Sequence, residues 1–181
     1  MRSWRIVILP YIEEDQLFRQ YDFEQQWDEP TNSDLADRMP KVYSLRTERK
    51  PGLKITNYLA IVGEQTVWRP GKPLNDKMIK DGTSNTILLP ENRGLNMHWM
   101  EPRDLEFETM DWTINSPRGI SSKYDAPAVV MLDGSVRRLS LSITPDVLKA
   151  LATIEGNEKL SDDKGEWRMI PDGRLRPVTE P

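Results

Sequence analysis

A strand–turn–strand pattern between residues 128 and 143 constrains the fold of this chain most. Residues 128–132 form an apolar run, the pair Asp133-Gly134 follows, and residues 135–143 alternate between apolar and polar side chains. An Asp-Gly pair between two such runs predicts a β-hairpin with a two-residue turn, in which both central residues have positive φ. We therefore expect an antiparallel sheet.

A helix is predicted directly after this hairpin. Thr144 can serve as its N-cap, Pro145 suits the first turn, and Asp146 places an acid near the positive end of the helix. Apolar residues then recur at helical spacing up to Gly156, a suitable C-terminal residue. Strands are further expected at residues 56–62 and 86–89. No alternating strand–helix–strand pattern occurs, so the predicted class is α+β with a mostly antiparallel sheet.

The N-terminal region is predicted to be helical. Residues 3–21 have helical periodicity with a break at Pro10, and Asn32 or Ser33 can cap a two-turn helix that ends at Pro40. One apolar face of the first helical region is expected to hold Tyr11, Leu17, Phe18 and Tyr21.

The length of 181 residues and the hydrophobic content of 37 % fit one domain with a tail. We place the domain at residues 1–158 and a polar tail at 159–181. Within the tail, residues 166–178 either form a small hairpin about Pro171-Asp172-Gly173 or stay loose.

Several function classes are excluded by residue types that are rare or missing. The chain has no cysteine, which excludes disulfides, thiolate zinc sites and iron–sulfur clusters. Its single histidine, His98, excludes a multi-histidine metal site within one chain. The net charge of -4, without a basic stripe, argues against nucleic acid as a partner. No apolar stretch approaches the length of a membrane span or of a signal-peptide core, so we expect a soluble chain.

No catalytic residue, cofactor or metal ligand is assigned from the sequence. His98 has no Gly-x-Ser-x-Gly nucleophile motif to serve. The acid pairs Glu101 with Asp104 and Glu106 with Glu108 are not specific in a chain with 29 acids. Residues 162–166 resemble a calcium loop only faintly, because they lack EF-hand spacing, and a solvated turn is the plainer interpretation. A calcium site of another kind stays open.

The six tryptophans are scattered along the chain, which favours packing roles over a sugar-binding face. Residues 81–86 combine Asp81, Gly82 and Asn85 with hydroxyl side chains, a composition typical of a turn whose side chains bond its own backbone.

The order of short motifs, by contrast, is specific. The strings are SWRIVILPYIE at residues 3–13, WDEPTN at 27–32, MPKVY at 39–43, NYLAIVG at 57–63, DGTSNTILL at 81–89, WMEPRDL at 99–105 and DGSVR at 133–137. In this order they resemble the domain of unknown function 1559 family, prepilin-type proteins abundant in planctomycete bacteria.

The resemblance implies a pilin-like or pseudopilin-like headgroup whose N-terminal anchor helix is missing from this chain. Family members carry a histidine, nine intervening residues and then Asp-Gly, so that Lys123 stands at the histidine position before Asp133-Gly134, and they carry a Tyr-x-Cys-Pro-Ser motif where this chain has residues 43–47. Motif positions of unknown role are Trp4, Trp27, Asp81, Gly82, Asn85, Trp99, Pro102, Lys123, Asp133 and Gly134.

Three functions are weighed. The first is a non-enzymatic envelope or surface protein that acts through contacts with other proteins, like subunits included, in secretion or surface assembly; a membrane would be reached only through the missing anchor. The second is an extracellular carbohydrate- or ligand-binding module that uses exposed Trp68 or Trp99. The third is a carboxylate hydrolase with His98 as acid or base. We rank them in that order.

Overall fold

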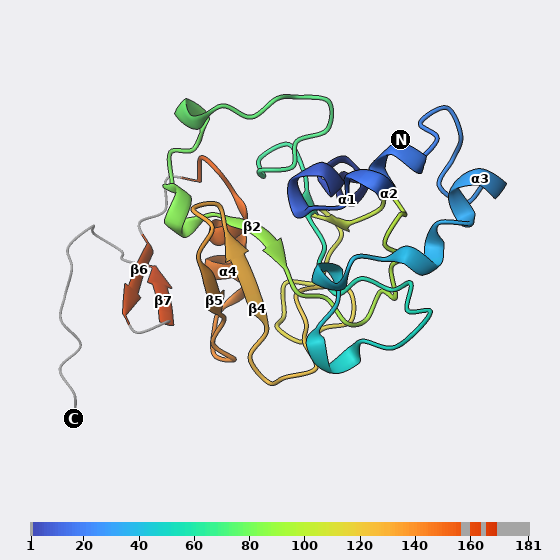
Figure 1. Cartoon of the computed structure of the whole chain (residues 1–181). Coiled ribbons are helices and arrows are strands. Elements are labelled where there is room, and N and C mark those ends of the chain that lie inside the picture. Colours follow the sequence, from blue (N-terminus) through green and yellow to red (C-terminus); the bar gives the residue numbers. More distant parts are fainter. Residues whose placement is uncertain (1, 157–159, 164–165, 170–181) are drawn as a thin grey trace. The chain divides into compact units, whose positions relative to one another are not determined.

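The computed structural model describes residues 2–156, 160–163 and 166–169, and its contacts divide the chain into two compact units (Figure 1). Unit 1 comprises residues 1–58 and 95–104, and unit 2 comprises residues 59–94 and 105–181. Short helices and small sheets, antiparallel and parallel, confirm the mixed α+β class. The predicted domain boundary at residue 158 stays a prediction.

Unit 1 begins with three short helical segments; the break near Pro10 was predicted, and a second break at Glu13 was not. They are α1 (Trp4–Val7), η1 (Leu9–Ile12), which has Pro10 in its first turn, and α2 (Asp15–Gln20). Glu13 ends η1 in a left-handed conformation with φ of 64°. This interruption changes the helical register, so the expectation of one shared face is wrong for Tyr11, which is 85 % exposed while Leu17 and Tyr21 are buried.

The next part of unit 1 consists of α3 (Pro30–Ser33), η2 (Ala36–Arg38), η3 (Lys41–Tyr43) and η4 (Arg46–Glu48). The predicted cap at Asn32 or Ser33 is wrong, because α3 starts earlier, with Glu29 as N-cap and Pro30 in the first turn. Asn32 is buried instead: its Oδ1 accepts from the Asp22 N–H at 2.8 Å, and its Nδ2 donates to the Asp22 and Gln26 carbonyls at 2.9 Å each. Its amide therefore stabilises the preceding loop.

The hydrophobic core of unit 1 joins α1, η1 and α2 to residues from later segments. Its buried members are Ile6, Leu9, Leu17, Tyr21, Leu35, Ala36, Tyr43, Trp99 and Met100.

Unit 2 contains the sheets of the described chain. Strands β2 (Ile87–Pro90), β4 (Ala128–Met131) and β5 (Val136–Arg138) form an antiparallel sheet in the order β2-β4-β5. Strands β1 (Ile61–Val62) and β3 (Leu105–Glu106) form a parallel pair, and η5 (Asp76–Met78) and η6 (Thr83–Asn85) lie between β1 and β2 in the sequence. Helix α4 (Pro145–Ala152) contacts β2 (Figure 1).

The strand predicted at residues 56–62 is confirmed only at its end, as β1. The preceding residues bond locally instead: the Thr56 Oγ1 donates to the Tyr43 carbonyl at 2.9 Å and accepts from the Tyr58 N–H at 3.1 Å. Such side-chain bonds compete with a regular strand ladder.

The hairpin at Asp133-Gly134 is confirmed, but its turn differs from the predicted one. The Met131 N–H donates to the Ser135 carbonyl at 2.8 Å and the Gly134 N–H to the Met131 carbonyl at 2.9 Å, which closes a three-residue loop. Only Gly134 has positive φ, at 83°. A type I turn followed by one left-handed residue explains this geometry, and the Asp133 carboxylate supports it by accepting from the Ser135 N–H at 2.8 Å.

The second arm of the hairpin is shorter than predicted, because β5 ends at Arg138. Leu139 is buried but Leu141 is 60 % exposed, so the expected alternation stops after Leu139.

Helix α4 begins as predicted, with the Thr144 side chain accepting from the Val147 N–H at 3.4 Å. It ends at Ala152 rather than near Gly156. The chain turns there, because Thr153 is extended and the Ile154 carbonyl accepts from the Lys80 N–H at 2.7 Å.

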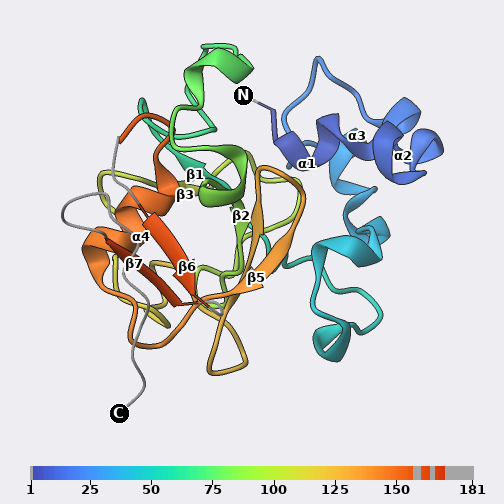
Figure 2. The ribbon, with the colours of Figure 1, turned by 90° about the vertical axis from the view of Figure 1, so that its left-hand side faces the viewer.

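A C-terminal hairpin exists, although its strands are not the predicted ones. Strand β6 (Leu160–Asp163) pairs with β7 (Glu166–Met169), next to α4 (Figure 2). The hairpin expected about Pro171-Asp172-Gly173 lies outside the described residues. No helix in the described parts of the chain is long and apolar enough to cross a membrane.

Candidate functional site

The tryptophans of unit 1 that we singled out are packing residues. Trp99 is completely buried and donates from Nε1 to the Ala36 carbonyl at 2.9 Å. Trp4 donates from Nε1 to Asp104 at 3.3 Å. The ring of Trp27 lies 4.7 Å from that of His98, and Pro102 is half-buried in the loop that follows. Trp68, in unit 2, donates to the Leu88 carbonyl at 2.8 Å.

Two Asp-Gly motifs of unit 2, at residues 81–82 and 133–134, meet in space. The Asp133 N–H donates to the Thr83 carbonyl at 3.1 Å, and the Leu132 N–H to the Thr86 carbonyl at 2.8 Å. Near them, the Asp81 carboxylate accepts from the Gly156 N–H at 2.8 Å, and the Asn85 Nδ2 donates to the Asp81 carbonyl at 3.2 Å.

Residues 81–86 are therefore hydrogen-bonded both to the β4–β5 loop and to the segment that follows α4. Gly82 has φ of 86° and precedes η6. Lys123, which stands where the resembling family has histidine, is exposed.

His98 is held as a neutral acceptor. Its Nδ1 accepts from the Met100 N–H at 3.2 Å. Burial, followed by the positive charge of Lys54, lowers the pKa of His98. Glu101 and Asp104, which follow His98 closely in the sequence, pair with arginines: Glu101 with Arg103 and Asp104 with Arg5.

Arg5 forms a polar centre in unit 1 that sequence reasoning missed. Its side chain is 0 % exposed, and its Nη2 lies 2.5 Å from the Asp104 carboxylate. Nε donates to the Tyr58 carbonyl at 3.2 Å, while Nη1 donates to the Ser3 Oγ at 3.1 Å and the Glu101 carbonyl at 3.3 Å. Burial lowers the pKa of Arg5, and Asp104 opposes that shift. With every nitrogen of the guanidinium engaged, the group is a structural anchor.

Tyr43 extends this anchor. Its hydroxyl donates to the Arg5 carbonyl at 2.6 Å, and its ring stacks on Trp99 with centroids 6.1 Å apart. Burial raises the pKa of Tyr43, so the hydroxyl keeps its proton and remains a donor.

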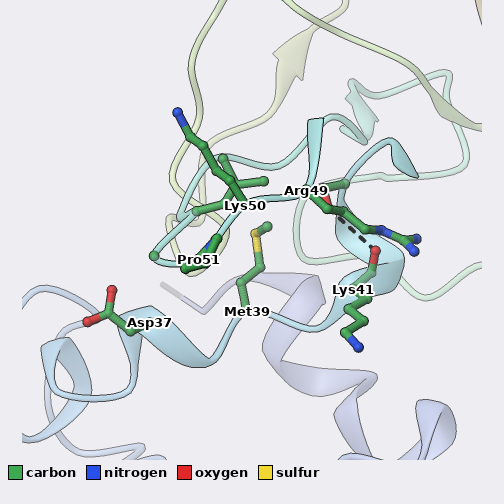
Figure 3. A pocket seen from close by; sticks show the side chains of 9 residues that line it. Asp37, Met39, Lys41, Arg49, Lys50 and Pro51 are labelled. Atoms are coloured by element: carbon green, nitrogen blue, oxygen red, sulfur yellow. Dashed lines mark hydrogen bonds between the residues drawn. The ribbon is translucent and has the colours of Figure 1, made fainter. Parts of the chain in front are cut away.

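A pocket of about 400 Å³ is formed by residues close to Tyr43 in the sequence, and all of its lining belongs to unit 1 (Figure 3). One wall is residues 37–44 and the other is residues 49–53. Its lining comprises Asp37, Met39, Lys41, Ser44, Arg49, Lys50, Pro51, Gly52 and Leu53. We call it the basic pocket, because it has three cations and one acid.

The second wall of the basic pocket is shaped by a tight turn. The Leu53 N–H donates to the Lys50 carbonyl at 3.2 Å, and Gly52 adopts φ of 70°, which a glycine accommodates without strain. Lys54, the residue after the second wall, has its Nζ 3.2 Å from the carboxylate of Asp37 in the first wall, so an ion pair connects the end of the turn to the first wall.

Asn57 holds the connection between the walls. Its Oδ1 accepts from the Leu45 N–H at 2.8 Å, its Nδ2 donates to the Glu48 carboxylate at 2.9 Å, and its backbone N–H donates to the Tyr43 carbonyl at 2.9 Å. The charged loop at residues 46–54 was visible in the sequence, but nothing in the sequence showed that it faces Met39 and Lys41.

Comparison with family models, curated proteins and solved structures finds no match to this chain. Within residues 2–156, 160–163 and 166–169, no group of three or more histidines and acids is arranged to hold a metal ion. The faint calcium loop at residues 162–166 falls partly outside the described residues.

Proposed function

We propose that this chain is a non-enzymatic, pilin-like protein of the cell envelope or surface that acts through protein–protein contacts. Two features support the proposal: the collinear motif strings that resemble prepilin-type proteins, and a three-stranded antiparallel sheet next to a helix in a mixed α+β chain. Trp68 and Trp99, on which the carbohydrate-binding alternative depends, are committed to packing and to backbone carbonyls.

The observation that carries the proposal is an apolar helix surface in unit 1. Ile6 and Leu9 are completely buried, yet the same short helical stretch exposes 49 % of Val7 and 85 % of Tyr11. A helix that is apolar on both sides is normally covered on both sides. Tyrosine is also among the residues that contribute most to protein interfaces. This exposed side of α1 and η1 is therefore a docking surface.

Self-association of the chain tests this surface. Burial of one large apolar side chain contributes roughly 1.5–3 kcal/mol, so Tyr11→Ser is expected to weaken association by about tenfold or more. Analytical ultracentrifugation over a concentration series measures the effect. Tyr124→Ser, on the other unit and 41 % exposed, is the matched control.

The result that contradicts the proposal is a monodisperse monomer at high concentration that also binds no hydrophobic dye. Equal weakening by Tyr11→Ser and Tyr124→Ser would place the contact elsewhere.

A further inference from the structure

We infer that the basic pocket binds an acidic segment of a partner protein, with an apolar residue of that segment seated between the two walls. The inference rests on the proposed function only in that the ligand is a protein segment.

The charge of the pocket points to an anionic ligand. Among the described residues, Lys41, Arg49 and Lys50 form no ion pair, and all three are exposed. Of the neighbouring acids, Asp37 pairs with Lys54 and Glu48 accepts from Asn57, so the three cations of the lining still exceed the acids available to them. A local excess of positive charge is unexpected in a chain of net charge -4. It raises the local concentration of acidic partners and accelerates their association.

The direction of the three side chains favours an extended ligand over a small anion. In Figure 3 the amine of Lys50, the guanidinium of Arg49 and the amine of Lys41 point away from one another around the rim. In this arrangement a phosphate or a single carboxylate contacts one of them. A chain segment with several separated carboxylates can meet all three.

The apolar part of the pocket favours a peptide over a sugar or a nucleic acid. The Met39 side chain points toward Pro51 and Lys50 (Figure 3), and Leu53 completes an apolar surface between the cations. Methionine adapts to varied side chains and is common at peptide-binding surfaces. None of the lining residues is aromatic, so the pocket offers no platform on which bases stack.

Binding of a synthetic peptide tests the inference. The probe is a fluorescein-labelled peptide of repeated triplets, each with two glutamates and one leucine, followed by fluorescence anisotropy. The triple variant Lys41→Gln, Arg49→Gln, Lys50→Gln is expected to raise Kd by about tenfold, because exposed ion pairs each contribute a factor of a few. Met39→Ser should weaken this peptide but leave unchanged a peptide in which serine replaces each leucine.

The matched control removes the same charge elsewhere. Lys77→Gln, Lys123→Gln, Lys149→Gln also removes three exposed cations, all of which lie in unit 2 and none of which lines the pocket. This control is expected to bind the peptide within a factor of two of the original chain. Equal losses in both triple variants would show non-specific attraction and overturn the inference. Tighter binding of heparin or of pyrophosphate than of the peptide would overturn the choice of a protein segment.

The docking surface at Tyr11 and the peptide-binding pocket can be refuted independently of each other. Tyr11→Ser leaves every lining residue of the pocket in place, so it should not change peptide binding. Loss of peptide binding only in the pocket triple supports the inference even if Tyr11→Ser has no effect on self-association.

Discussion

Removal of the Asp104 carboxylate is expected to destabilise unit 1 strongly. Arg5 is 0 % exposed and the Asp104 side chain only 3 %, with 2.5 Å between their charged groups. In Asp104→Ala the guanidinium would stay buried with only neutral acceptors, namely the Ser3 hydroxyl and the Tyr58 and Glu101 carbonyls. A buried charge that loses its partner costs about 3–5 kcal/mol.

The assay is urea unfolding followed by tryptophan fluorescence and circular dichroism. Trp4, which donates to Asp104, and the buried Trp99 both report on unit 1. A loss of about 3–5 kcal/mol corresponds to a fall of roughly 6–20 °C in Tm for a chain of this length. The slope of unfolding free energy against urea should not change, because the substitution leaves the exposed area of the unfolded chain nearly the same.

The adjacent ion pair supplies the control. Arg103→Ala breaks the Arg103–Glu101 pair, in which the Arg103 side chain is 71 % exposed, and should cost no more than about 1 kcal/mol. The double variant Arg5→Met, Asp104→Leu removes both buried charges and should be more stable than Asp104→Ala. If Asp104→Ala costs no more than Arg103→Ala, Arg5 is not the anchor we describe.

Two further predictions concern His98 and the glycines. Because burial lowers the pKa of folded His98, the unfolded chain binds a proton at this histidine at a higher pH than the folded chain does. The contribution of neutral His98 to the free energy of unfolding should therefore be fully present above about pH 6.5 and be lost as the pH falls below it. His98→Asn, which still offers an acceptor to the Met100 N–H, should flatten the dependence of unfolding free energy on pH in this range; an unchanged slope would contradict the assignment. Gly134→Ala meets no atom within 4 Å and should cost about 1 kcal/mol for its positive φ alone. Gly119→Ala has ordinary φ but places its Cβ against the Asp111 carbonyl oxygen, so its Tm should fall further; equal Tm values would refute this.

The elements that sequence reasoning predicted well are those with local signals. Helix α4 begins where Thr144 can cap it and Pro145 can occupy its first turn, and both signals act within four residues. The hairpin before it depends on Gly134 in the same way. The detail that failed, a three-residue loop in place of two, depends on Leu132 and Asp133, whose backbone N–H groups bond to residues 83–86. That contact is distant in sequence, so no local pattern shows it.

The candidate site was harder to predict for the same reason. An arginine in the sequence is normally expected at the surface. Arg5 is buried because Tyr58, Glu101 and Asp104 supply its acceptors, and these lie 53 to 99 residues away. The basic pocket likewise needs the turn at Gly52 to face Met39. The charged residues and the turn-forming residues at these positions could be recognised in the sequence, but their closeness in space could not.

The position of Arg5 gives the motif strings a structural meaning. Its contacts bring together Ser3, Tyr43, Tyr58, Glu101 and Asp104, which belong to four of the strings on which the resemblance to prepilin-type proteins rests. These strings therefore build the scaffold of unit 1. The basic pocket takes Met39 and Lys41 of its first wall from one of these strings, whereas residues 49–53, which form its second wall, belong to no string. In the proposed recognition of an acidic segment, the second wall is therefore the part that can differ while the Arg5 scaffold stays the same, and discrimination between partners depends on the contacts that differ.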